Sequence, residues 1–189
     1  MLLAFLLLLQ TAVSPVVVST CSAGQFVTGI NTGGSHTCAT PVGGSGPTYV
    51  VLTATRTNAT TSYADITDLV IPVAANQRLS VECRFVYSAN ATTTGIGIGW
   101  TGPASPTLTS GRMFSGLTSA TVGGTTVIGN DTGGVTTASV GTTGNAATFT
   151  GFWSNGANAG NVQMRFKSEV AIASAIVIQA GSWCRYSTY

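Results

Sequence analysis

The sequence predicts an all-β protein: an antiparallel β-sandwich with jelly-roll or Greek-key connections, preceded by an extended N-terminal segment and a small cysteine-paired hairpin. Three observations favour this class. Short runs rich in β-branched and aromatic residues recur along the chain, Gly, Asn, Asp and Pro separate them, and no stretch after Leu9 keeps a helical period. Many short strands in one domain are typical of a sandwich or barrel.

The first part of the chain, residues 1–20, is an apolar N-terminal segment. Its run Met1–Leu9 is too short to span a bilayer, which takes about 20 residues, so we expect no stable membrane span. Two alternatives stay open: a signal peptide, or an assembly segment that docks on a neighbouring subunit because its apolar surface avoids water. The residues expected to make the assembly contact are Leu2, Leu3, Phe5, Leu6, Leu8, Leu9, Val16, Val17 and Val18.

Residues 21–47 are expected to form a small hairpin followed by a linker rich in Gly and Pro. Gln25–Ile30 alternates as a strand does, a turn containing Gly follows, and Ser35–Thr40 returns beside it. Cys21 and Cys38 then fall on the two arms of the hairpin. A disulfide between them would hold together a unit that is too small to be stable alone.

The main domain, residues 48–189, is predicted to be the sandwich. In its longest expected strand, alternate residues are apolar and share one face: Leu79, Val81, Cys83, Phe85 and Tyr87. The expected strands are Tyr49–Thr55, Asp68–Val73, Arg78–Ser88, Gly95–Trp100, Thr125–Ile128, Thr148–Trp153, Val162–Ser168 and Ala175–Tyr186.

The four cysteines suit two disulfides better than a zinc site, because no CxxC pair occurs and the chain has one histidine. Cys83 lies on the apolar side of its strand, and Cys184 shares a parity with Ile176, Ile178 and Ala180. Both thiols should therefore point into the core, which predicts a second disulfide between them; two buried free thiols are the alternative. Disulfides indicate an oxidising compartment or the cell exterior.

The chain carries few charges. Charged residues make up 6 % of its 189 residues, against about 25 % in an ordinary soluble domain, while hydrophobic residues make up 44 %. Surfaces with so little charge tend to associate, so we expect neighbouring copies of the chain to cover much of this one. The seven basic residues are scattered singly, which argues against the basic surface that nucleic-acid binding requires.

Residues suited to catalysis do not gather in the sequence. His36 is the only histidine and lies in the expected hairpin, and no Gly-x-Ser-x-Gly motif occurs. Glu82 and Glu169 are each flanked by strands, and we expect them to form ion pairs with Arg84 or Arg165. We therefore expect no catalytic, cofactor-binding or metal-binding residues, and a protein that is not an enzyme.

Two further motifs have structural or surface interpretations. Gly95–Gly99 resembles a dinucleotide-binding loop only superficially, because no helix follows; we expect a Gly-rich strand against which another backbone packs. Three Asn-x-Thr sequons, at Asn58, Asn90 and Asn130, are acceptor sequences for N-linked sugar in a host that modifies them.

Two blocks of the sequence resemble a family of tailed-phage and phage-like virion proteins. These are Thr92–Thr107, TTTGIGIGWTGPASPT, and Gly160–Ser182, GNVQMRFKSEVAIASAIVIQAGS. Cys21–Cys38 likewise resembles short linking units of phage fibre proteins. The resemblance covers most of Val51–Tyr189 and implies a β-rich structural module of a tail or fibre rather than a reaction. The apolar, uncharged N-terminus departs from the family, which leaves both a virion and a cell-made fibre open.

The sequence therefore predicts a structural subunit whose partners are copies of itself, in an extracellular filament or at a virion surface. The alternative is a β-sandwich module that binds a surface glycan or receptor. In that case exposed aromatic rings would stack on sugars, and the candidates are Trp100, Trp153 and Trp183, although burial in the core is the simpler role for them.

Overall fold

The computed structural model describes residues 21–22, 25–30, 35–39, 46–127, 129–131, 133–173 and 175–189. The chain divides into two compact units, Met1–Gly43 and Gly44–Tyr189, which we call the hairpin unit and the sandwich unit. The expected assembly contacts, from Leu2 to Val18, lie outside the described residues, as does most of the expected linker. Docking of the N-terminal segment therefore stays a prediction.

The hairpin unit contains two antiparallel strands, β1 (Phe26–Ile30) and β2 (His36–Ala39). A disulfide joins Cys21 to Cys38, as the sequence predicts. Val27 and Ile30 are exposed, so their burial contributes little to this unit's stability. The disulfide is its main constraint, which is how small units without a sufficient core are commonly stabilised.

The sandwich unit consists of antiparallel strands in two sheets, and no helix occurs among the described residues. Its strands are β3 (Thr48–Val51), β4 (Arg56–Asn58), β5 (Ala64–Val73), β6 (Arg78–Ala89), β7 (Ile96–Thr101), β8 (Leu108–Gly116), β9 (Val122–Val127), β10 (Asn145–Ser154), β11 (Gly160–Ser168), β12 (Ile176–Ile178) and β13 (Trp183–Thr188). The predicted all-β sandwich is confirmed.

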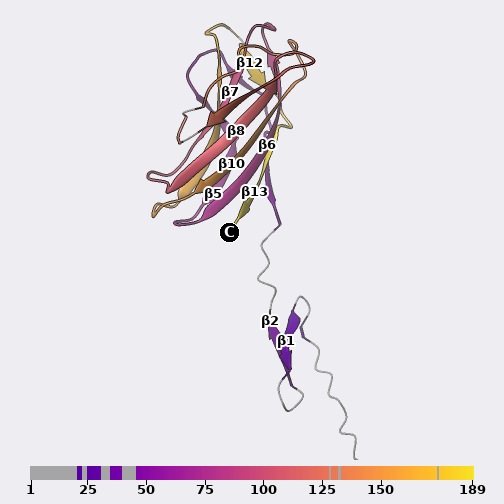
Figure 1. Ribbon diagram of the computed structural model, residues 1–189, viewed down its shortest axis with the longest axis vertical. Helices are drawn as coiled ribbons and strands as arrows, with labels where there is room; N and C mark the ends of the chain where they lie inside the picture. The colour runs from indigo at the N-terminus through magenta and orange to yellow at the C-terminus, as the bar shows by residue number, and fades with distance from the viewer. Residues whose placement is uncertain are drawn as a thin grey trace, which may run out of the picture. The chain divides into compact units, whose positions relative to one another are not determined.

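The larger sheet has eight strands. Its main path runs β3-β13-β6-β10-β8-β9, and β12 joins β4 to the end of β6. Figure 1 shows β8, β10, β6 and β13 side by side. The second sheet has three strands in the order β5-β11-β7. After the β8–β9 hairpin the chain returns as β10 on the other side of β8, which is a crossing of the Greek-key kind.

The core lies between the two sheets. On β6 the five alternate residues from Leu79 to Tyr87 are all buried, as predicted, because a strand turns every second side chain to the same face. Trp100 packs edge-on against Phe149 and Trp153, with ring centroids 4.9 and 5.4 Å apart. A Cβ at Gly151 would lie 2.5 Å from the Trp100 ring, so this glycine provides room for the indole.

The second predicted disulfide, Cys83–Cys184, is also present. The two residues lie directly opposite each other on β6 and β13, and both are fully buried. One part of the prediction is wrong: Ala180 is exposed. The expected strand Ala175–Tyr186 is interrupted by a turn in which Gly181 has a φ of +87°, and this turn separates β12 from β13.

Candidate functional site

The most distinctive outer surface of the sandwich unit lies on β3, β13 and β6. Because Cys83 and Cys184 point inward, their sequence neighbours point outward. Strand register places Trp183 opposite Val51 and Arg84, and Arg185 opposite Tyr49 and Glu82. We call this set the aromatic–arginine patch: Tyr49, Val51, Glu82, Arg84, Trp183 and Arg185.

The aromatic part of the patch is a pair of rings. The centroids of Tyr49 and Trp183 are 5.5 Å apart, and their planes are tilted by 54°. Tyr49 is 55 % exposed and Val51 is 49 % exposed, whereas Trp183 is half-buried. An accessible tilted ring pair next to charged groups can hold another apolar surface or stack on a flat ligand.

The charged part of the patch is one carboxylate between two arginines. Glu82 accepts hydrogen bonds from Arg84 at 2.9 and 3.1 Å through Oε1, and from Arg185 at 2.5 and 3.0 Å through Oε2. These bonds, first from Arg185 and then from Arg84, lower the pKa of Glu82. The hydrogen bonds that Arg185 donates to Glu82 in turn raise the pKa of Arg185. Glu82 is therefore ionised near neutral pH and is poorly suited to carry a proton.

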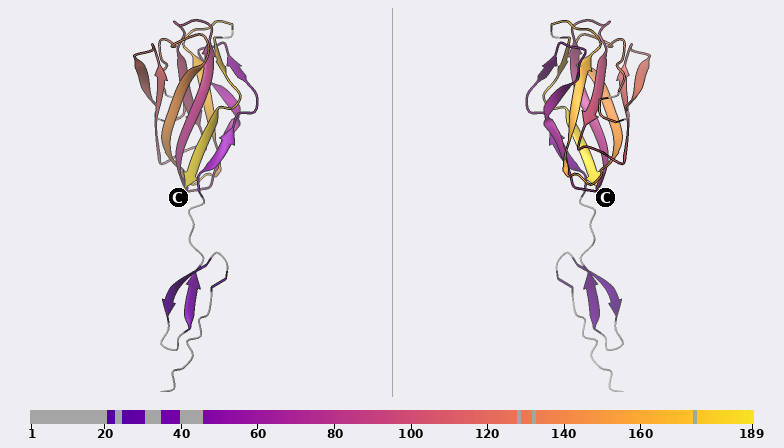
Figure 2. Two further views of the ribbon diagram at one scale, coloured as in Figure 1. Left: turned by 90° about the vertical axis from the view of Figure 1, so that its right-hand side faces the viewer. Right: turned by 90° about the vertical axis from the view of Figure 1, so that its left-hand side faces the viewer.

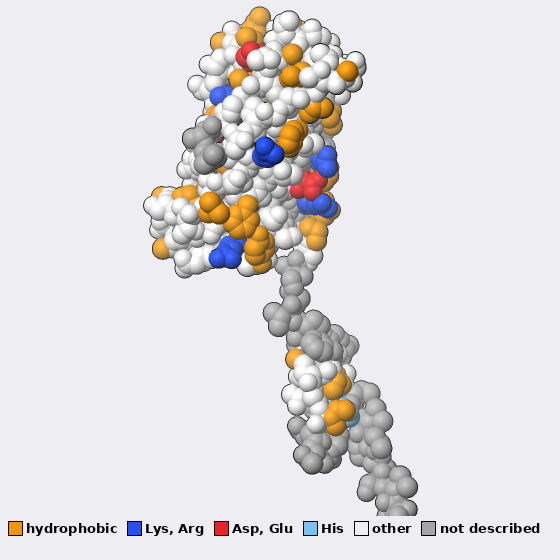
Figure 3. Space-filling view, viewed as in Figure 1, with side chains coloured by type: hydrophobic (Ala, Val, Ile, Leu, Met, Phe, Trp, Pro, Cys, Tyr) orange, Lys and Arg blue, Asp and Glu red, His pale blue; other side chains and the backbone are white. Residues whose placement is uncertain are grey.

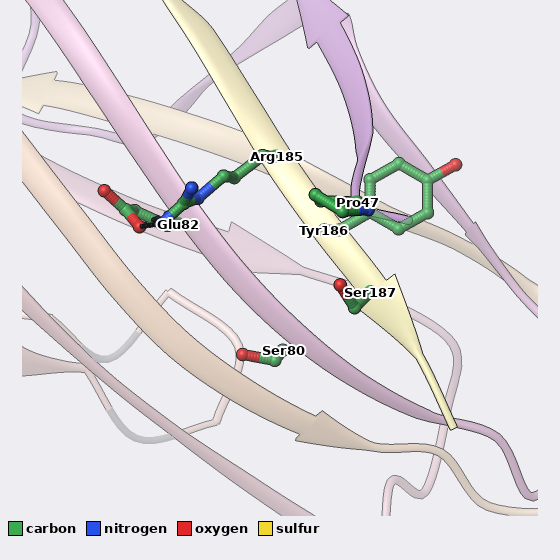
Figure 4. Close-up of a pocket in the computed structure, with 6 residues that line it drawn as sticks. All are labelled: Pro47, Ser80, Glu82, Arg185, Tyr186 and Ser187. Atoms are coloured by element: carbon green, nitrogen blue, oxygen red, sulfur yellow. Dashed lines mark hydrogen bonds and ion pairs between the residues drawn. The ribbon is translucent and has the colours of Figure 1, made fainter. Parts of the chain in front are cut away.

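A shallow hollow of about 210 Å³ opens beside this ion pair. Figure 4 shows Arg185 reaching across to Glu82, while the Tyr186 ring and Pro47 lie on the other side of β13. Ser80 and Ser187, which are opposite each other in the sheet, supply two hydroxyls to the same hollow. Its size and polarity suit a side chain or one sugar unit rather than a large cofactor.

Large apolar side chains continue across the outer face of the eight-stranded sheet. On this face Val86, Leu108, Phe114 and Val122 are 47, 55, 39 and 68 % exposed. The Arg112 guanidinium stands 5.9 Å from the Phe114 ring centroid. Figure 3 shows a mostly uncharged surface on which basic and acidic side chains occur in a few small groups. We call the exposed apolar residues the outer sheet face: Tyr49, Val51, Val86, Leu108, Phe114 and Val122.

The smaller sheet carries a second polar cluster around Arg165. This residue pairs with Asp65 at 2.7 Å and with Asp131, and it donates a hydrogen bond to the Tyr63 carbonyl at 2.8 Å. Burial raises the pKa of the Tyr63 phenol to about 12, and the Lys167 ammonium lies 4.7 Å from its ring centroid. The cluster links β5, β11 and the segment after β9, so we assign it a structural role.

The predicted ion pairs are confirmed only in part. Glu82 does pair with Arg84, but Glu169 forms an ion pair with neither Arg84 nor Arg165. Glu169 instead accepts a hydrogen bond from the Gly95 backbone N–H at 3.1 Å. Arg165 binds two other carboxylates, which approach it through strand pairing and a loop that the sequence alone does not place.

The expected Gly-rich strand is β7. A Cβ at Gly95 would stand 1.5 Å from the carbonyl oxygen of Thr136, a distance that no side chain could tolerate. The Thr136 N–H also donates to the Ile96 carbonyl at 3.0 Å. A second backbone therefore packs against β7, as predicted, and covers the edge of the smaller sheet.

The three tryptophans do not contribute equally to the surface. Trp100 and Trp153 are fully buried, so they cannot stack on a sugar, and Trp183 alone among the candidates reaches the surface. The sequence identified Trp183 and Glu82 but missed Tyr49 and Arg185. Tyr49 and Arg185 could have been identified as outward-facing residues of their strands. That they lie beside Glu82 and Trp183 follows only from the register between the strands.

The sequons also differ from one another. Asn58 is 4 % exposed, and its side-chain amide donates to the carbonyls of Ser62 and Phe166 at 2.9 and 2.8 Å. An amide used in this way cannot carry a sugar in the folded protein, which corrects the expectation at this position. Asn90 and Asn130 are exposed, and glycosylation there stays a prediction.

Three further observations concern the described part of the chain. His36 lies on β2 in the hairpin unit. No group of three or more His, Cys, Asp or Glu side chains in that part of the chain could hold a metal ion. None of its segments forms a helix of the length and apolarity needed to cross a membrane.

Comparisons with known proteins give little. No family model and no curated protein matches the chain. A solved structure with partial similarity is the crystal structure of the infectious bursal disease virus VP2 subviral particle, at 9 % identity and a TM-score of 0.21. The match covers 80 % of this chain and 42 % of that chain, so this chain spans less than half of its length. Similarity at this level carries no argument about function.

Proposed function

We propose that the chain is a non-enzymatic structural subunit that assembles with copies of itself into an extracellular filament or a virion appendage, with its N-terminal segment docked on a neighbouring subunit. The observation that carries this proposal is the outer sheet face. Six large apolar side chains, from Tyr49 on β3 to Val122 on β9, are exposed across one sheet. Large apolar side chains exposed on one face of a sheet are suited to an interaction site.

The energetics favour a covered surface. Burying apolar area stabilises by about 25 cal/mol per Å², so covering side chains that are already half-exposed favours association. Little electrostatic repulsion opposes it, because the whole chain has a formal net charge of +2. The two disulfides are compatible with an oxidising environment outside a cytoplasm.

Electron microscopy and sedimentation of the purified full chain test this proposal. We expect regular polymers, and a protein that stays monomeric at every concentration would contradict it. Val86→Ser should weaken assembly because it removes an apolar side chain from the outer sheet face. Val170→Ser is the matched control, since this valine is 39 % exposed in a loop away from that face.

The aromatic–arginine patch supports a second candidate function, which is glycan recognition. A ring pair beside two serine hydroxyls and an ion pair has the composition of a sugar-binding surface, with rings for stacking and polar groups for the hydroxyls. A glycan array probed with the purified chain tests it. Binding that is lost in Trp183→Ala would favour recognition, and polymers without any glycan binding would favour assembly alone.

A further inference from the structure

The β9 strand forms an unusual edge of the eight-stranded sheet. It pairs with β8 on one side, and no described strand pairs with its other side. Its six residues, Val122–Val127, include no charged residue and no proline. Every second residue of such a strand directs its backbone N–H and C=O away from its partner, so β9 offers unpaired hydrogen-bonding groups. Figure 2 shows β9, coloured salmon, at the margin of the sandwich unit in the right-hand view.

The other edges of the sandwich unit are protected. β5 carries Asp65 and Asp68 and ends near Pro72, which has no N–H to offer. The edge of β7 accepts backbone hydrogen bonds from Asp131 and Thr136. β3 has only four residues, and β4 has three and begins with an arginine. Short, charged, proline-containing or covered edges resist pairing with another chain, and β9 has none of these protections.

A hollow of about 190 Å³ lies beside β9. Gly123–Thr125 line it on one side and Val135–Thr137 on the other. The Thr125 hydroxyl is buried there without a hydrogen-bond partner among the described residues. The segment after β9 hydrogen bonds to β7, but no backbone hydrogen bond joins its described residues to β9. The segment that follows β9 therefore leaves the backbone edge of β9 without a hydrogen-bonded neighbour among the described residues.

The N-terminal segment has the properties that this edge requires. It has 20 residues outside the described structure, and none of them is charged. Pairing along most of a six-residue strand takes about five residues, which extend over about 17 Å. Val16, Val17 and Val18 have high β-propensity, and with Ser19 and Thr20 they form a stretch without proline. Strand addition derives its affinity from backbone hydrogen bonds and its specificity from alternate side chains.

We propose that the stretch Val16–Thr20 of one copy adds as a strand to the free edge of β9 in a second copy. This inference rests on the proposed self-assembly and identifies the surface that accepts the N-terminal segment. It also explains why β9 lacks the protective features of the other edges: a charge or a proline on β9 would prevent another chain from pairing with it.

Disulfide trapping tests the contact directly. A chain with Val17→Cys is mixed with a chain carrying Thr126→Cys on β9 and exposed to mild oxidant. The four native cysteines are all paired, so only the new thiols can react. We expect a covalent dimer of the two chains on a non-reducing gel. Thr150→Cys is the matched control, because this threonine is exposed on the same face of the sheet but lies on the interior strand β10.

The outcomes separate this inference from the proposed function. If the full chain polymerises but Thr126→Cys gives no more dimer than Thr150→Cys, the β9 contact is wrong and self-assembly stands. If the full chain never polymerises, the proposed function fails as well. If a chain lacking residues 1–20 still polymerises and Val122→Lys abolishes this, two β9 edges pair with each other and the N-terminal occupant is wrong.

A lysine substitution gives the second test. Val122→Lys places a charge on an edge residue that is 68 % exposed, and we expect loss of polymers with normal folding by circular dichroism. Val86→Lys makes the same substitution on the outer sheet face but on the interior strand β6, so it should weaken assembly less than Val122→Lys. Equal effects of the two variants would contradict the β9 contact.

Discussion

At the scale of single residues, Asn58 shows how a polar side chain can stabilise a core. Its amide donates to the carbonyls of Ser62 and Phe166, and its oxygen accepts hydrogen bonds from the N–H and hydroxyl of Thr60, both at 2.8 Å. Asn58 thus joins β4, the following turn and β11. Removing it would leave buried carbonyls without donors.

We predict that Asn58→Ala lowers the free energy of unfolding by about 1–3 kcal/mol, the usual cost of an unsatisfied buried polar group. Urea denaturation followed by fluorescence measures it. Asn130→Ala, at an exposed sequon, should change the free energy by less than about 0.5 kcal/mol. An unchanged midpoint in Asn58→Ala would show that these hydrogen bonds contribute nothing net.

Gly95 is a residue whose missing side chain matters. The carbonyl of Thr136 occupies the place of a Cβ and belongs to the backbone, so it cannot move aside as a flexible side chain would. We predict that Gly95→Ala costs about 3 kcal/mol or more, at the upper end of overpacking effects. Gly46→Ala should be nearly neutral, because no atom lies within 4 Å of its Cβ position. Thermal unfolding of both variants compares them, and equal melting temperatures would disprove the close approach.

Glu82 and Asp68 predict how stability depends on pH. Hydrogen bonds from Arg185 and Arg84 lower the pKa of Glu82, and hydrogen bonds from Thr53 lower that of Asp68. The unfolded chain therefore binds protons more readily than the folded protein. The contribution of these two carboxylates to the free energy of unfolding is complete above their ordinary pKa values, 4.5 for Glu82 and 3.8 for Asp68. It is lost as the pH falls through their lowered pKa values in the folded protein. We expect melting temperatures to fall below about pH 4.5, less steeply in Glu82→Gln. If the melting temperature of Glu82→Gln fell with pH as steeply as that of the unchanged protein, the role of Glu82 would be contradicted.

At the scale of elements, strands with apolar residues on the inward face could be predicted from the sequence. The whole of β6 was predicted within one residue, because Leu79–Tyr87 alternates without interruption. The strand β8 was missed, since its inward residues are Thr109, Gly111, Met113 and Ser115, and only the methionine is large and apolar. Small residues suit that position because the Phe149 ring fills the space above Gly111.

The other errors also have local causes. β5 begins four residues earlier than predicted, because a bulge changes the inward parity between Ile66 and Leu69. The Gln163 amide donates to both of their carbonyls and so stabilises the bulge. The short strand β4 was not predicted at all. In the candidate site, Tyr49 joins Arg185 only through strand pairing, and pairing between distant segments cannot be derived from a local pattern.

The hairpin unit depends on its disulfide more than on packing. We predict that replacing Cys21 and Cys38 by serine removes hydrogen-exchange protection from β1 and β2, because closing a loop of about 15 residues contributes about 3 kcal/mol. Amides of β6 and β13 should keep their protection, since these strands belong to the other unit. Exchange measured by mass spectrometry tests this, with Ser22→Ala as an exposed control. Unchanged protection in the hairpin would mean that its strands are stable without the cross-link.

At the scale of the whole molecule, the proposed self-assembly would explain both the small number of charges and the exposed apolar side chains. A sandwich with an apolar outer sheet face and an unguarded β9 edge is poorly suited to remain alone in water. Neighbouring copies would cover the face, and the N-terminal segment of one copy would complete the sheet of the next. Self-assembly through residues 1–20 is therefore the central claim.

Sedimentation velocity of two proteins, the full chain and a chain of residues 19–189, tests this claim most directly. We predict that the full chain sediments as polymers, while the shortened chain is monomeric and keeps the β-sheet circular dichroism of the sandwich unit. The free energy of docking is lost with the apolar segment, but the core of the sandwich unit is unaffected. A shortened chain that polymerises as well as the full chain, or a full chain that remains monomeric, would contradict it.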